Sequence, residues 1–101
     1  MTSIRIEPEA AAELEAAALR YEQAVPGLGS RFLGEMRARV GHVLEAPGSF
    51  PVFGNTSDVR CAHALGRFPH LVVFMVVDDV VRVLAFMHPR QRPGYWSHRR
   101  R

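Results

Sequence analysis

The sequence predicts an α+β protein with two layers, in which two amphipathic helices pack on one face of a mainly antiparallel sheet. Two segments with helical spacing of apolar residues come early in the chain, and three segments rich in β-branched residues come later. The expected order is β-α-α-β-β-β, followed by a basic C-terminal tail. With 101 residues, the whole chain (1–101) is expected to form a single domain, because a second independent core would not fit.

The first half of the chain is predicted to hold one short strand and both helices. Residues 3–6 alternate as a short strand does, and Pro8 suits the first turn of a helix. The apolar stripe of the first helix consists of Ala10, Leu14, Ala17, Ala18, Tyr21 and Val25. Glu13 falls outside this stripe. The segment 26–29 breaks the helix, and Pro47 ends the second one. The second stripe consists of Phe32, Leu33, Met36, Val40, Val43 and Leu44.

Two glycines lie inside the second predicted helix. Gly34 and Gly41 each cost about 1 kcal/mol of helix propensity relative to alanine. Close approach of the first helix would compensate for this cost. We therefore expect the two helices to touch at Gly34 and Gly41.

The second half of the chain is predicted to supply three strands. Residues 59–65 alternate in the manner of a strand, and the continuous apolar run 71–77 predicts a strand covered on both faces. Asp78-Asp79 is the predicted hairpin turn, and residues 80–87 return as a buried strand that only Arg82 interrupts. Because burying an unpaired charge is costly, we expect Arg82 to reach solvent or a carboxylate, and we favour an internal pair.

Charge is distributed unevenly along the chain. Residues 1–50 carry seven acids and five arginines, a net charge of −2, whereas residues 51–101 carry three acids and eight arginines, a net charge of +5. Five of these arginines and no acid lie between residues 88 and 101. Such a basic half suits a nucleic acid or an acidic protein partner, and a solvated basic face is the alternative interpretation.

Several classes of protein are disfavoured by the sequence. Cys61 is the only cysteine, so an intrachain disulfide is impossible and a reducing compartment is expected. The first eight residues lack a secretory signal pattern, and the apolar run 71–77 is far too short to cross a bilayer. We therefore expect a cytoplasmic protein without membrane contact. The five histidines show no metal-ligand spacing, and Gly27-Leu28-Gly29 lacks the rest of a phosphate-binding loop, so neither metal nor cofactor is expected.

Three short motifs are spaced along the predicted elements. They are Pro26-Gly27-Leu28-Gly29-Ser30-Arg31-Phe32-Leu33, Arg67-Phe68-Pro69, and His88-Pro89-Arg90-Gln91-Arg92-Pro93-Gly94-Tyr95-Trp96. Together with the order of elements, they resemble the RelE/ParE toxin superfamily, the small toxins of type II toxin–antitoxin modules that are also described as plasmid-stabilisation proteins. The resemblance extends over nearly the whole chain, from Ile4 to Arg99.

The resemblance implies one of two activities. RelE-like toxins cut mRNA in the ribosome with basic side chains on the sheet, whereas ParE-like toxins lack that set and their characterised members inhibit DNA gyrase. The positions that are basic in the RelE-like pattern hold Ala62, Ala64 and Leu71 in this chain. This difference favours the ParE-like branch, an inhibitor that acts by binding gyrase. The alternatives are a ribosome-dependent mRNA endonuclease and a non-toxic remnant that only binds its antitoxin.

The candidate target-binding residues lie in the tail and in one turn. They are Arg67, His88, Arg90, Arg92, Tyr95 and Trp96. For the endonuclease alternative, the candidates that activate the 2′-hydroxyl and stabilise the phosphate are His88, Arg67, Arg90 and Arg92. Tyr95 or Trp96 would then stack a base. Packing of the tail on the body is the competing interpretation, and we favour it for Trp96.

The resemblance also implies partners. A cognate antitoxin is expected to wrap an amphipathic C-terminal segment around the helical pair and the sheet, and to neutralise the toxin. DNA gyrase or the ribosome is the expected target. Contact with DNA is expected only indirectly, through the complex with the antitoxin.

Overall fold

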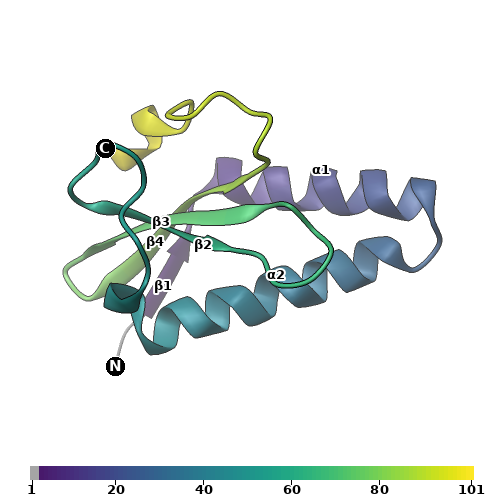
Figure 1. The fold of residues 1–101 in the computed structure, drawn as a ribbon, viewed down its shortest axis with the longest axis horizontal. Coiled ribbons are helices and arrows are strands. Elements are labelled where there is room, and N and C mark those ends of the chain that lie inside the picture. The colour runs from purple at the N-terminus through teal and green to yellow at the C-terminus, as the bar shows by residue number, and fades with distance from the viewer. Residues whose placement is uncertain (1–2) are drawn as a thin grey trace.

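The structure, a computed structural model, describes residues 3–101. Within them, two long helices cover one face of a four-stranded sheet of order β1-β4-β3-β2 (Figure 1). The strands are β1 (Ser3–Ile6), β2 (Val59–His63), β3 (Leu71–Val77) and β4 (Val80–Met87), and the helices are α1 (Pro8–Ala24) and α2 (Leu28–Glu45). β1 runs parallel to β4, and the other neighbours are antiparallel. The predicted α+β fold with two layers is confirmed.

The sheet separates two apolar clusters, because successive side chains of a strand point to opposite faces. The cluster under the helices includes Phe32, Met36, Val43, Val72, Phe74 and Val83. The cluster on the opposite face includes Val59, Val73, Met75, Leu84, Met87 and Trp96. The run 71–77 is therefore covered on both faces, as predicted, but only as far as Met75, since Val76 and Val77 are exposed.

Of the three glycines in α2, Gly29 is the one packed against α1, and the prediction of contact at Gly34 and Gly41 was wrong. A Cβ atom at Gly29 would lie 2.5 Å from the carbonyl oxygen of Ala18, whereas one at Gly34 or Gly41 would meet no atom within 4 Å. The reason is geometric: Gly34 lines a pocket with Gly66 and Arg67 that no residue of α1 lines, and the helices diverge from the turn that joins them (Figure 1). There the Glu22 carboxylate also accepts hydrogen bonds from the Gly27 and Gly29 amides, at 2.8 and 3.0 Å.

The remaining boundaries follow local chemistry. Asp78 and Asp79 adopt φ angles of 50° and 62°, the left-handed pair that a two-residue hairpin of the I′ type requires. The predicted strand 59–65 ends at His63, and Leu65 is exposed in the turn that follows. Val25, predicted to be in the stripe of the first helix, is exposed because α1 ends at Ala24. Among residues 3–101, neither helix combines the length and apolar character that a membrane span requires.

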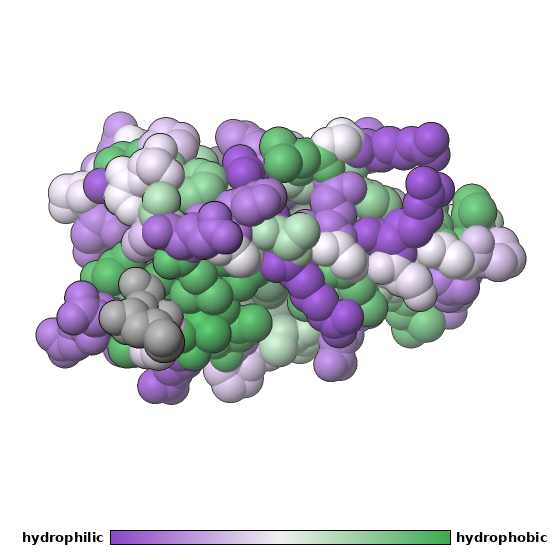
Figure 2. All heavy atoms as spheres, turned by 90° about the horizontal axis from the view of Figure 1, so that it is seen from below, coloured by the Kyte–Doolittle hydropathy of each residue, from purple (hydrophilic) through white to green (hydrophobic). Residues whose placement is uncertain are grey.

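Several large apolar side chains stay exposed around the helix–sheet layer. Ile4 and Ile6 on the edge strand β1 are exposed, as is Val76 on β3. Figure 2 shows apolar surface gathered at the left end of the molecule, the end at which β1 begins. On α1, Leu19 is 58% exposed beside an open groove of about 330 Å³ that Leu33 of α2 also lines. Apolar surface of this kind is typical of a face that a partner covers.

Candidate functional site: the C-terminal segment

The segment after β4 folds back over the sheet face opposite the helices (Figure 1). Its Trp96 side chain is 1% exposed and meets the Phe53 ring edge-on, with ring centroids 5.3 Å apart. Leu84 and Met75 belong to the same buried cluster. Trp96 therefore packs the tail on the body, which confirms the packing interpretation for this residue, and its ring is closed to direct contact with a partner.

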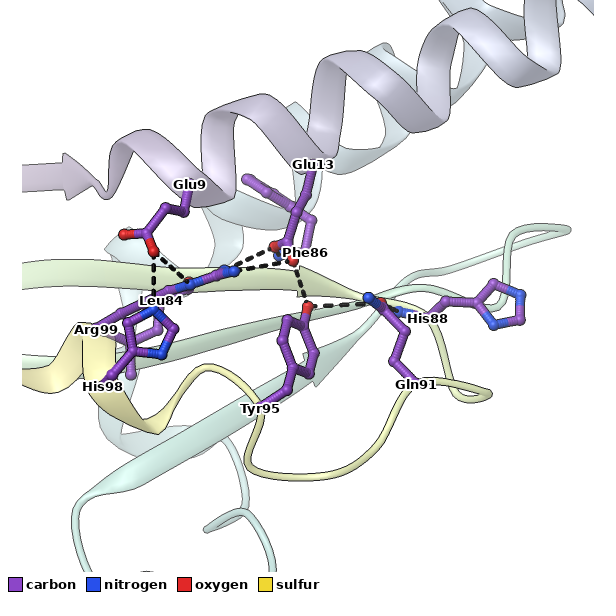
Figure 3. A network of polar contacts seen from close by, with 9 residues as sticks. All are labelled: Glu9, Glu13, Leu84, Phe86, His88, Gln91, Tyr95, His98 and Arg99. Carbon is purple, nitrogen blue, oxygen red and sulfur yellow. Dashed lines mark hydrogen bonds and ion pairs between the residues drawn. The ribbon is translucent and has the colours of Figure 1, made fainter.

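Glu13 on α1 is the centre of a hydrogen-bond network that holds the tail (Figure 3). Its carboxylate accepts a hydrogen bond of 2.6 Å from the Tyr95 hydroxyl, one of 3.0 Å from Arg99 Nη1 and one of 3.2 Å from the Phe86 amide. Arg99 Nη1 also donates to the carbonyl of Leu84 at 3.0 Å. Because the Arg99 side chain is only 9% exposed, water screens this ion pair little. The network therefore joins α1, β4 and the tail.

Both tail members of this network keep their protons. Burial raises the pKa of Tyr95, and the hydrogen bond and charge of Glu13 raise it further. Burial acts to lower the pKa of Arg99, but the hydrogen bond and charge of Glu13 outweigh it and the pKa is raised. The hydroxyl and the guanidinium therefore remain donors throughout the neutral pH range.

A second set of contacts anchors the last residues of the chain. Arg82 on β4 donates to the carbonyl oxygens of Arg99 and Arg100, at 2.7 and 3.0 Å, and its Nε lies 3.4 Å from a Glu7 carboxylate oxygen. Arg100 in turn pairs with Asp58 at 2.6 Å. The expected internal pair of Arg82 is confirmed. Its guanidinium also supplies donors for backbone carbonyls of the chain end.

Residues 88–94 form an exposed loop between β4 and the anchored part of the tail. Arg90 and Arg92 are exposed, and within residues 3–101 neither one makes an ion pair. Local hydrogen bonds shape the loop: the Arg90 amide donates to His88 Nδ1 at 3.0 Å, and the His88 amide donates to Gln91 Oε1 at 2.8 Å. The loop therefore presents two cationic groups to solvent on a locally ordered backbone.

The base of the loop rests on a buried histidine. The His88 ring meets the His70 ring edge-on, with centroids 5.1 Å apart, and Tyr21 and Phe32 also pack around His70. Burial lowers the pKa of His70 to about 4, with further contributions from His88 and Arg20. His70 is therefore neutral near pH 7 and acts there as an aromatic core residue.

Arg67 lies in the turn between β2 and β3. It is exposed and, with Arg31 of α2, lines an open pocket of about 340 Å³. Because Leu71 pairs with Met87, this turn and the 88–94 loop start from the same end of the sheet. Within residues 3–101, no hydrogen bond or ion pair joins Arg67 to that loop. The structure thus brings them to one end without direct contact.

Sequence reasoning missed the role of Glu13, which was placed outside the apolar stripe. Its spacing contains a signal: Glu13 lies three residues after Ala10 and four before Ala17, both of which are buried. An acidic residue between buried neighbours on one helix face is a candidate for a buried ion pair. The partner, Arg99, is 86 positions away and has no local signal.

The positions at which the RelE-like pattern has basic residues lie in the apolar clusters. Ala62 is buried and Ala64 is partly buried beneath the helices, and Leu71 belongs to the cluster on the opposite face. Within residues 3–101, no three side chains of His, Cys, Asp or Glu are grouped so that they could hold a metal ion. The exposed cationic groups of the 88–94 loop are Arg90 and Arg92, and the half-buried His88 lies beside them.

Two helices on one face of a four-stranded sheet, with a basic C-terminal segment packed on the other face, form the arrangement expected from the resemblance to RelE/ParE toxins. The chain belongs to the family described as "ParE toxin of type II toxin-antitoxin system, parDE", which matches residues 4–93. A solved structure described as "Chromosomal ParDE TA system from P. aeruginosa" contains a chain of the same fold, with a TM-score of 0.77 and 19% sequence identity. The match covers 87% of this chain and 96% of that chain. No curated protein matches the sequence.

Proposed function

We propose that this ParE-family toxin acts by binding and inhibiting DNA gyrase, and that a cognate antitoxin neutralises it. The observation that carries the proposal is the pair of unpaired arginines, Arg90 and Arg92, on an exposed loop of the described residues 3–101. An arginine that already pairs within its own chain must break that pair to bind a partner, whereas a free guanidinium can bind a carboxylate or phosphate directly. The loop also lies almost wholly within the matched range, residues 4–93.

The proposed contact surface consists of this loop and its neighbours at the same end of the sheet. His88 is the first residue of the loop, and Arg67 lies in the turn between β2 and β3 at the same end of the sheet. Tyr95 and Trp96 hold the loop from its other side, so their proposed contribution is indirect. We therefore assign direct contact with the target to Arg90, Arg92 and His88, with Arg67 as a secondary contact.

The apolar surface beside the helices supports the antitoxin part of the proposal. An amphipathic segment would cover Leu19 and Leu33 along the groove of α1 and α2, and it would continue over Ile4 and Ile6 on the edge strand. A segment that folds on binding is well suited to wrap such a divided surface. The solved relative comes from a toxin–antitoxin system, which supports the same kind of partner here.

A supercoiling assay with purified gyrase tests the proposal. The wild-type toxin, freed from antitoxin, is expected to inhibit supercoiling, and the double variant Arg90→Ala, Arg92→Ala is expected to lose about tenfold or more in potency, as loss of charged contacts at an interface does. Arg37→Ala is the control, because Arg37 is exposed and has no ion pair within residues 3–101. Normal supercoiling at doses of toxin that arrest growth would exclude gyrase as the target.

Mapping of transcript ends after induction separates the other activities. Codon-aligned cuts that disappear in His88→Ala would favour the ribosome-dependent endonuclease. Growth without any defect, together with retained antitoxin binding, would identify a remnant that is no longer toxic. Inhibition of gyrase without new transcript ends supports the proposal as stated.

A further inference from the structure

The outer edge of β4 is only partly covered by β1. The parallel pairing ends where Ile6 lies beside Val83, and the last bond along this edge runs from the Glu7 amide to the Val83 carbonyl at 3.0 Å. β4 continues to Met87. Within the described part of the chain, residues 84–87 therefore have no strand beside them on this side, and unpaired backbone groups on an edge are expected to need other partners.

Two side chains take the place of the missing strand. The Glu13 carboxylate accepts the hydrogen bond of the Phe86 amide at 3.2 Å, and Arg99 Nη1 donates to the Leu84 carbonyl at 3.0 Å. Glu13 and Arg99 are themselves joined at 3.0 Å (Figure 3). The ion pair thus offers β4 one acceptor and one donor, as a neighbouring strand would.

The edge groups that the pair satisfies are out of reach of water. Leu84 is fully buried and Phe86 is 3% exposed. A buried amide or carbonyl without a partner is strongly unfavourable, so the docked position of Arg99 is strongly preferred over a detached one. Arg99 Nε also lies 3.6 Å from a Glu9 carboxylate oxygen. The contacts of His98 with Glu9 and of Arg100 with Asp58 involve side chains that are a third or more exposed, and they contribute less.

We infer that Glu13 and Arg99 are positioning residues, which hold the 88–94 loop in place by closing the open edge of β4. The loop is fixed at its start by the pairing of Met87 with Leu71. It is fixed at its end by Tyr95 and Arg99, which both bind Glu13. Binding of the target by this loop rests on the proposed function. The positioning of the loop by the ion pair is independent of the proposed function.

Exchanging the charges of Glu13 and Arg99 distinguishes two explanations of the docked tail: hydrogen bonding to the edge of β4, and attraction between opposite charges alone. The double variant Glu13→Arg, Arg99→Glu keeps two opposite charges side by side, but it turns a donor toward the Phe86 amide and an acceptor toward the Leu84 carbonyl. If the pair closes the edge, the exchange fails to rescue the docked tail. If only the attraction of opposite charges matters, the exchange rescues it, and the inference is overturned.

Hydrogen exchange of backbone amides and the fluorescence of Trp96, the single tryptophan, report whether the C-terminal tail is packed on the sheet. In Arg99→Ala, we expect hydrogen exchange at Phe86 and at the hydrogen-bonded amides of His88, Arg90 and Gln91 to become about tenfold faster or more, with red-shifted Trp96 emission. Glu13→Gln keeps an acceptor for the Phe86 amide and is the milder variant, expected to give an intermediate change if Arg99→Ala fails to fold. Glu45→Gln is the control, because Glu45 is exposed and has no partner within residues 3–101. Unchanged exchange in both Glu13 and Arg99 variants would overturn the inference.

Function is read separately. A positioning role predicts that Arg99→Ala loses about tenfold in growth inhibition while its affinity for the antitoxin and its helical content stay near those of the wild type. Full toxicity with a released tail would contradict that role. If the wild type leaves gyrase unaffected, the proposed target is wrong, yet the exchange rates at Phe86 and in the loop still decide whether the pair positions the loop.

Discussion

The two halves of the C-terminal segment are both basic, but their arginines have different surroundings. Residues 88–94 carry Arg90 and Arg92, which are exposed and, within residues 3–101, free of ion pairs. Residues 95–101 carry Arg99 and Arg100, which pair with carboxylates of α1 and of the segment before β2, and Arg101, which is exposed and has no ion pair within residues 3–101. The comparison teaches that a run of arginines is not one functional unit. The acids that the fold brings near each arginine decide whether it anchors the chain or remains free for a partner.

Residues 95–101, the anchored half of the segment, cover the apolar sheet face opposite the helices. A sheet with helices on one side alone would leave Val73, Met75 and Leu84 in water. The tail covers them with Trp96, and the ion pairs around it fix the position of that cover. The following predictions test the division between the anchored and the free half, from the largest expected effect on stability to the smallest.

Removal of the central anchor is expected to have the largest effect. Trp96→Ala should lower the free energy of unfolding by about 3–5 kcal/mol, because it leaves a cavity in the cluster opposite the helices. Urea unfolding followed by far-UV circular dichroism measures this change, and Trp96→Phe, which keeps most of the ring, is the control. A loss below about 1 kcal/mol would mean that the tail contributes little to the fold.

Acid is expected to weaken the base of the free loop. The pKa of His70 is about 4 in the folded protein and 6.5 in its ordinary state, so the unfolded chain binds more protons between these values. The contribution of neutral His70 to the free energy of unfolding is therefore fully present above pH 6.5. It is lost as the pH drops towards 4, which lowers the free energy of unfolding by up to roughly 3 kcal/mol. Urea unfolding at a series of pH values measures the slope. His70→Phe should reduce it, and an unchanged slope would assign the acid sensitivity to other groups.

Loss of Arg82 is expected to release the chain end. Arg82→Ala removes the donors to the carbonyls of Arg99 and Arg100 and one partner of the buried Glu7 carboxylate, which should cost about 2 kcal/mol. Thermal unfolding measures the loss. The double variant Arg82→Met, Glu7→Leu should recover part of it, since no buried charge then lacks its partner. If the double variant is no more stable than the single one, the loss comes mainly from the hydrogen bonds to the carbonyls of Arg99 and Arg100, and the unpaired Glu7 contributes little.

The free half is expected to contribute least to stability. The double variant Arg90→Ala, Arg92→Ala should change the free energy of unfolding by no more than about 0.5 kcal/mol, because neither side chain has a partner within the described residues. Urea unfolding beside the supercoiling assay shows whether activity and stability separate. A loss of several kcal/mol would show that these arginines support the fold and would remove the distinction between the halves.

Local pattern was sufficient to predict most of the elements. The alternation in residues 3–6, the proline at position 8 and the β-branched run from Leu71 predicted β1, α1 and β3. The Asp78-Asp79 turn was predicted from its position between two strands, and the structure places both residues in the left-handed region. These features depend on neighbours along the chain, which the sequence displays directly.

Contacts between distant segments were beyond local pattern. Helix propensity identified Gly34 and Gly41 as sites of close approach, but only the packed structure shows that Gly29 is the glycine that touches α1. Likewise the tail was predicted to be basic and aromatic, and Trp96 was correctly expected to pack on the body. The role of Glu13 in the network could be recognised only once β4 was placed, because the Phe86 amide of β4 is one of the hydrogen-bond donors to Glu13.

The sequence by itself determined the elements, their order and the family, because side-chain periodicity and short motifs are local properties. The tertiary structure alone decided which arginines are free. Glu13 and Arg99 are separated by 86 positions, and they meet because β4 lies beside the start of α1 and the tail folds over the opposite face. Electrostatic pairing depends on distance in space, and that distance is set only when the sheet and helices have packed.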